Sequence, residues 1–133
     1  MNNGFKLEIV NPEKSFLSKE DISEVIVPAY EGDMGILKDH ISIISFLKPG
    51  LVRVIDMSSV EETYYVEDGI IEFKNNCLSV LTSNIFDIKK IDRNKIKDIL
   101  SQAEKDSQNS DISDLAKYLI DQKIEVLRSL TLN

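Results

Sequence analysis

Hydrophobic and polar positions alternate along the first two thirds of the chain. Phe5, Leu7 and Ile9 fall on one face of a half-buried strand, because successive side chains of a strand point to opposite faces. Further short apolar runs, several of them separated by turn-forming residues, occupy residues 15–17, 23–27, 41–47, 51–55, 63–66, 70–73 and 77–82. Closely spaced strands without a helical pattern between them predict an antiparallel β-sandwich, or flattened barrel, over residues 1–87.

The pattern changes after residue 87. Apolar residues then recur at i, i+3, i+4 and i+7, which is the spacing of one helix face. They are Ile96, Ile99, Leu100 and Ala103. Asp92 stands where a helix N-cap is expected. The pattern therefore predicts an amphipathic helix over residues 92–106.

A second helical pattern follows a polar loop. The loop, residues 107–111, is rich in Ser, Asn and Asp, and residues 112–130 again carry their apolar side chains on one side. Two such helices joined by a short loop predict an antiparallel helical hairpin over residues 88–133. We thus expect two domains, a larger β domain followed by a smaller α domain.

Charge and composition exclude several classes of protein. The 133 residues carry a formal net charge of −7, and residues 1–87 hold seven Lys and Arg against 15 Asp and Glu. Such an acidic body repels phosphate backbones, so we expect no nucleic-acid binding and favour a partner with basic patches. One cysteine excludes an internal disulfide, and no apolar run reaches the roughly 18 residues of a membrane span. We expect a cytosolic protein without direct membrane insertion.

Catalytic and metal chemistry find little support in the residue pattern. The single histidine, His40, follows Asp39, but adjacent residues on a strand point to opposite faces, so a structural or interface role is favoured over that of a general base. Cys77 precedes an alternating apolar run and is expected to be a buried strand thiol. Glu31 and Asp33 lie near His40 without the spacing of a calcium loop, so no metal site is predicted.

Two glycines flank Met34 in the segment EGDMGIL at 31–37. They lack the lysine and the following helix of a phosphate loop, so nucleotide phosphate is not expected here. Gly32 and Gly35 are expected instead to supply special backbone angles in a tight connection. Met34 would then stand exposed or lightly covered, which suits a protein contact.

These segments, taken in order, resemble the epsilon subunit of bacterial F-type ATP synthases. The likeness covers nearly the whole chain, and its segments are SEVIVP at 23–28, EGDMGIL at 31–37, His40, LKPG at 47–50, DGIIEF at 68–73 and LSVLT at 78–82. Departures fall at Ala29, where the family usually has Gly, at Lys38, where Pro is common, and at residues 41–42, where Ala-Pro is expected.

The resemblance reaches the start of the first helix, where some bacterial relatives carry a nucleotide motif. That motif, I/L-D-x-x-R-A, stands here as IDRNKI, so Asp92 matches, Lys95 replaces the arginine and Ile96 replaces the alanine. Lysine keeps the charge but lacks the planar fork that suits a phosphate. We expect ATP to bind weakly or not at all, no cofactor to be held, and Asp92 to act as a plain N-cap.

The resemblance implies a non-catalytic rotor subunit of a proton-translocating ATP synthase. Family members bind the gamma subunit in the central stalk, rest on the ring of c subunits and couple proton flow to ATP synthesis at the cytoplasmic face of the bacterial inner membrane. In several bacteria the hairpin reaches the alpha/beta catalytic head and restrains ATP hydrolysis. By position, Glu31, Asp33, Met34 and His40 match the partner interface. The alternative is a free-standing β-sandwich that binds a ligand and carries a helical tail.

Overall fold

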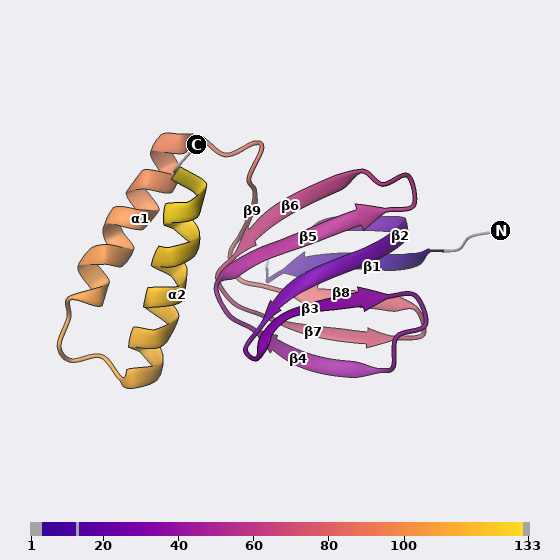
Figure 1. Cartoon of the computed structure of the whole chain (residues 1–133), viewed down its shortest axis with the longest axis horizontal. Helices are drawn as coiled ribbons and strands as arrows, with labels where there is room; N and C mark the ends of the chain where they lie inside the picture. The colour runs from indigo at the N-terminus through magenta and orange to yellow at the C-terminus, as the bar shows by residue number, and fades with distance from the viewer. Residues whose placement is uncertain (1–3, 13, 132–133) are drawn as a thin grey trace.

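The computed structural model describes residues 4–12 and 14–131. It contains nine strands and two helices in these ranges: β1 (Phe5–Asn11), β2 (Lys14–Ala29), β3 (Gly32–Leu37), β4 (Ile43–Leu47), β5 (Gly50–Asp56), β6 (Glu61–Val66), β7 (Gly69–Lys74), β8 (Cys77–Leu81), β9 (Ile85–Asp87), α1 (Arg93–Ser107) and α2 (Asp114–Thr131). The strands form the predicted sandwich, and the two helices stand beside one end of it (Figure 1).

The strands pair in the order β1-β8-β7-β4-β2-β5-β6-β9, and β2 also pairs with β1, which closes a flattened barrel. β3 pairs with β2 outside this path. Every described pairing is antiparallel except β1 with β8, which run parallel from Lys6 beside Cys77 to Val10 beside Leu81. The predicted antiparallel sandwich is confirmed, with this pair as the exception, because no hairpin fixes the relative direction of two strands that lie so far apart in sequence.

Alternating side chains from both layers fill the interior. Leu7, Ile9, Val25, Ile71 and Leu78 are fully buried members of this core. Phe5 and Phe73 meet edge to face within it, with ring centroids 5.5 Å apart. Burial of this apolar surface is the main stabilising contribution to the sandwich.

Two strands were absent from the sequence prediction. The segment expected to be a tight connection forms β3, after a turn at Tyr30 and Glu31. Gly32 has the expected unusual backbone angle, with φ of 131°, whereas Gly35 does not have a positive φ. β9 has only three residues, which is too few to show an alternating pattern.

β2 is a single strand of 16 residues where the sequence suggested two separate runs. Its pairing with β5 is irregular between Ile22 and Glu24, and the neighbouring Asp21 has φ of 58°. A bulge of this kind bends a strand, so one strand can pair with β1 through its first half and with β3 and β5 through its second.

The hairpin packs on the outer side of the sandwich through a second apolar cluster. Leu51, Tyr65 and Phe86 lie side by side on β5, β6 and β9, and Tyr65 and Phe86 stack with ring centroids 4.7 Å apart. Ile96 and Leu127 are buried against this row. The helices begin and end within two residues of the predicted bounds, and the Asp92 carboxylate caps α1 by accepting the Asn94 N–H at 2.9 Å.

Candidate functional site

A group of exposed apolar side chains lies on the outer side of β4, β7 and β8. The strand register places Phe46 beside Ile70 and Ile70 beside Leu81. These side chains are 61%, 42% and 49% exposed, and Ile44 on the same strand as Phe46 is 65% exposed. Tyr30 joins Phe46 at the edge of a shallow hollow of about 360 Å³. We call these five residues the apolar face.

Contiguous exposed apolar side chains are a common feature of binding surfaces. The sequence analysis missed the apolar face. In strand β4 the polar Ser45 lies on the inward side and the apolar Ile44 and Phe46 on either side of it are exposed, which is the reverse of what alternation leads one to expect.

The predicted interface residues do not form one cluster. Glu31 lies in the β2–β3 turn and lines a small hollow with Tyr30, Ile44 and Phe46, so it borders the apolar face. Asp33 is exposed at the start of β3, and His40 follows the other end of that strand. Met34 is half-buried and packs against the sandwich core, so it offers less free surface than the sequence suggested.

His40 and Asp39 have separate partners. The Nδ1 of His40 donates to the carbonyl of Ile41 at 2.7 Å, and its ring meets Phe73 edge to face. Asp39 has φ of 64° and makes two hydrogen bonds with Asn76. The Asn76 Nδ2 donates to the Asp39 carboxylate at 2.9 Å, and the Asn76 Oδ1 accepts the backbone N–H of Asp39 at 2.7 Å. The Asp–His pair of a general base is therefore not formed, and the contacts of His40 are structural.

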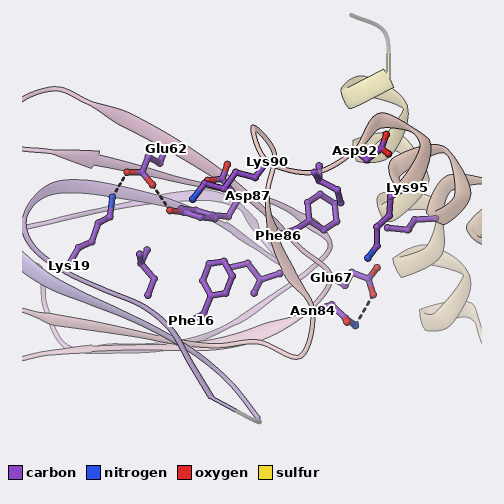
Figure 2. Close-up of a pocket in the computed structure, with 15 residues that line it drawn as sticks. Phe16, Lys19, Glu62, Glu67, Asn84, Phe86, Asp87, Lys90, Asp92 and Lys95 are labelled. Carbon is purple, nitrogen blue, oxygen red and sulfur yellow. Dashed lines mark hydrogen bonds and ion pairs between the residues drawn. The ribbon is translucent and has the colours of Figure 1, made fainter.

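A cleft of about 940 Å³ separates the sandwich from the start of the hairpin (Figure 2). Its walls carry both charges and aromatic rings, from Phe16, Lys19, Glu62, Tyr64, Phe86, Lys90, Asp92 and Lys95. Asp92 and Lys95 both line it, yet they point in different directions, and one oxygen of Asp92 is occupied by its capping bond. The pair is thus not arranged to hold one phosphate group between them.

Lys19, Glu62 and Tyr64 form a hydrogen-bonded chain at one end of the cleft. Lys19 donates to one oxygen of Glu62 and the Tyr64 hydroxyl donates to the other. The hydrogen bond from Lys19, followed by that from Tyr64, holds the pKa of Glu62 below its ordinary value. Burial, with the Glu62 carboxylate as the second cause, raises the pKa of Tyr64 well above its usual range.

Other chemistry is sparse in the part of the chain that the structure describes. No group of three or more His, Cys, Asp and Glu residues could hold a metal ion there. Cys77 is a half-buried free thiol in β8. Neither described helix is long and apolar enough to span a membrane. Together these features define a β-sandwich with a docked helical hairpin and an exposed apolar face.

Sequence comparisons identify the family to which this architecture belongs. Residues 4–88 match the family described as ATP synthase, Delta/Epsilon chain, beta-sandwich domain. The ATP synthase epsilon chain of Pelagibacter ubique is 68% identical over 130 residues, which cover 98% of this chain and 99% of that protein. The mitochondrial ATP synthase subunit delta of Pichia angusta is 30% identical over 94% of this chain and 78% of its own length. The chain therefore belongs to the delta/epsilon chain family of ATP synthases.

Solved structures share the fold at low sequence identity. A chain of the Euglena gracilis mitochondrial ATP synthase, solved with OSCP, F1 and c-ring, matches with a TM-score of 0.76 and 19% identity over 96% of this chain and 79% of that one. A chain from the central stalk and c-ring of the Tetrahymena thermophila enzyme matches with a TM-score of 0.63 and 15% identity over 95% of each chain. These likenesses establish the arrangement of sandwich and hairpin.

Proposed function

We propose that this chain is the epsilon subunit of a bacterial ATP synthase, a non-catalytic part of the central stalk that couples proton flow to ATP synthesis. The observation that carries this proposal is the 68% identity, along nearly the whole of both chains, to a protein named ATP synthase epsilon chain.

The gamma subunit is the partner proposed for the apolar face. Phe46 and Ile70 are large, apolar and adjacent, and such side chains supply most of the binding energy when an interface covers them. Glu31 at the edge of this face and Asp33 at the start of β3 carry negative charge toward a second partner, proposed to be the loops of the c-subunit ring. Met34 and His40 remain in the predicted interface as minor contributors, because both have contacts within the sandwich.

The two structural units have different proposed tasks. The β domain, residues 1–87, binds the stalk, and the hairpin, residues 88–133, is the part able to restrain ATP hydrolysis by contacting the alpha/beta head. The subunit then works at the cytoplasmic face of the bacterial inner membrane as a peripheral component. No cofactor is proposed, since Lys95 replaces the arginine of the nucleotide motif and points away from Asp92.

Replacement of Phe46 by Glu tests the gamma assignment. The variant places a charge at the centre of the apolar face, so co-purification with gamma should fall at least about tenfold while the thermal unfolding midpoint stays near that of the parent. Val60→Glu is the matched control, because Val60 is 54% exposed in the β5–β6 connection, away from this face. Equal binding by both variants would refute gamma docking on the apolar face. Failure of the parent chain to bind gamma at all would favour the free-standing module instead.

A further inference from the structure

The contact between hairpin and sandwich is small and mostly apolar. Its buried members are Tyr65 on the sandwich and Ile96 and Leu127 on the hairpin, with partly buried side chains around them. The Tyr65 hydroxyl is buried, and burial, followed by the nearby Glu67 carboxylate, raises the pKa of Tyr65 well above its usual range. An interface of this size provides limited stabilisation, so a single well-placed polar contact has a large share in deciding whether the hairpin stays docked.

One ion pair of the described chain crosses this interface. Lys123 on α2 places its Nζ 2.9 Å from the carboxylate of Glu67, at the end of β6. The other ion pairs lie within the sandwich or within the hairpin, as Arg128 with Glu104 does. Lys123 precedes Leu127 by one helical turn, so the ion pair lies on the same face of α2 as the buried leucine.

Glu67 is held in position by the sandwich. Asn84 donates its Nδ2 to Oε2 of Glu67 at 3.1 Å, and the backbone N–H of Glu67 donates to the carbonyl of Asn84 at 3.3 Å. The adjacent Asp68 accepts the hydroxyl of Ser83 at 2.8 Å, which fixes the same turn. Because the carboxylate is already ordered, less entropy is lost when Lys123 meets it.

The pair is also the least exposed of the hairpin's ion pairs. The side chains of Lys123 and Glu67 are each 24% exposed, against 61% and 43% for Arg128 and Glu104. Reduced exposure lowers the dielectric screening between the charges, so this pair is stronger than the exposed one. Figure 2 shows the Lys95 side chain of α1 extending in the direction of Glu67, which adds positive charge on the hairpin side of the same carboxylate.

We propose that Glu67 and Lys123 form an electrostatic latch that holds the hairpin docked on the sandwich. With the latch closed, the carboxylate on the rim of the sandwich fixes α2 beside the row of Leu51, Tyr65 and Phe86. With either charge removed, the docked state keeps only its apolar contact and opens more often. The proposal rests on contacts within the single chain and is independent of the partners proposed above.

Hydrogen exchange of the isolated full-length chain tests the latch. Glu67→Gln keeps the shape of the side chain and its contact with Asn84 but removes the charge. Amides of α1 and α2 should then exchange at least about threefold faster, while amides of the core strands β1 and β7 keep the parent rate. Lys123→Gln should also speed this exchange, by no more than Glu67→Gln does, because Lys95 still extends toward Glu67 in that variant. The double variant should exchange no faster than Glu67→Gln, since the loss of Glu67 already removes the interaction with Lys123.

Glu104→Gln is the matched control. It removes an ion pair of the same type that lies wholly within the hairpin, so the amides of α1 and α2 should exchange at nearly the parent rate. Raising salt from low to high concentration should speed hairpin exchange in the parent and not in Glu67→Gln. Unchanged hairpin exchange in Glu67→Gln, or an equal loss of hairpin protection in Glu104→Gln, overturns the latch. An equal increase of the exchange rate in the hairpin and in the core strands of Glu67→Gln overturns the latch as well.

Discussion

Lys19 and Glu62 connect two strands that do not pair with each other. Lys19 lies in the first half of β2 and Glu62 lies in β6, and the Phe16 ring meets Tyr64 edge to face between the same strands, with centroids 5.7 Å apart. Backbone hydrogen bonds pair β6 with β5 and β9, not with this part of β2. Side-chain contacts therefore connect these two strands, whereas backbone hydrogen bonds connect neighbouring strands elsewhere in the barrel.

The chain of hydrogen bonds on Glu62 makes stability depend on pH. Its pKa is lowered from the ordinary 4.5, so the folded state favours the charged carboxylate. This contribution is fully present above 4.5 and is lost as the pH falls through the lower folded-state value. Glu62→Gln should cost about 0.5 to 1 kcal/mol at pH 7, a modest value because the side chain is partly solvated. Urea unfolding at pH 7 and at pH 3 checks this, and the difference from the parent should shrink at pH 3.

Glu61→Gln is the control for this measurement. Glu61 pairs with Arg53 at 2.8 Å, but both side chains are more than 40% exposed. Its replacement should change the free energy of unfolding by less than that of Glu62 at pH 7. The role given to the hydrogen bonds of Glu62 would be contradicted if Glu61→Gln lowered the free energy of unfolding by as much as Glu62→Gln or more. It would also be contradicted if the effect of Glu62→Gln grew at low pH.

Residue by residue, the sequence identified polar positions better than apolar ones. Asp92 is the helix cap that its place before an apolar pattern predicted, because capping depends on local sequence alone. The exposure of Phe46 could not be predicted in the same way, since an apolar residue in a strand is normally assigned to the core. The limited exposure of Met34 has a similar cause, because its direction depends on β3, which the sequence did not reveal.

At the scale of elements, periodic patterns were decisive where the elements were long. The helices have 15 and 18 residues, enough for several turns of a repeating apolar stripe, and their bounds were predicted closely. β3 contains two glycines and β9 has only three residues, so neither shows a strand pattern in the sequence. Both are strands because they form backbone hydrogen bonds with a neighbouring strand, β3 with β2 and β9 with β6. Tertiary pairing, not local preference, determines these two strands.

The two apolar clusters predict that the hairpin can lose stability without the sandwich. Leu127 is fully buried in the docking cluster, so Leu127→Ala should destabilise the docked hairpin by about 2 to 5 kcal/mol. Because Leu127 is one of the few fully buried members of this cluster, α1 and α2 should lose exchange protection while β1 and β7 retain theirs. Hydrogen exchange resolved by residue provides the measurement.

Leu115→Ala is the matched substitution on the same helix. Leu115 is 58% exposed, so its truncation should change exchange in α2 only slightly. If the core strands also lost exchange protection in Leu127→Ala, sandwich and hairpin would unfold as one cooperative unit. The two apolar clusters would then not differ in stability, contrary to this prediction.

For the whole molecule, the sequence alone predicted a sandwich followed by a hairpin but not how the barrel closes. Closure depends on the parallel contact of β1 with β8 and on the bulge that lets β2 serve two neighbours. Both involve residues far apart in sequence, which local periodicity does not encode. Segments such as DGIIEF and LSVLT identified the family because their resemblance and order were compared along nearly the whole chain, not within one local window.

The same arrangement leads to a prediction about the proposed restraint of ATP hydrolysis by the hairpin in the assembled enzyme. One continuous helix from Arg93 to Thr131 would be about 58 Å long, at 1.5 Å per residue, and could reach from the stalk into a catalytic head. To form it, the loop residues Asn109, Ser110 and Asp111 must become helical, at up to about 0.7 kcal/mol each relative to alanine. The docking cluster around Tyr65 and the contact of Lys123 with Glu67 would also be lost.

These costs favour the docked hairpin, and the head can shift the balance only by its greater affinity for the extended form. We therefore expect deletion of residues 88–133 to raise ATP hydrolysis by less than about tenfold, equivalent to 1.4 kcal/mol, in a complex with equal subunit content. Steady-state hydrolysis by complexes carrying the full chain or residues 1–87 is the measurement, and stoichiometry of gamma is the control for assembly. A larger rise would mean that Lys117 and Arg128, free of Asp121 and Glu104, bind the head strongly enough to outweigh the docked contacts.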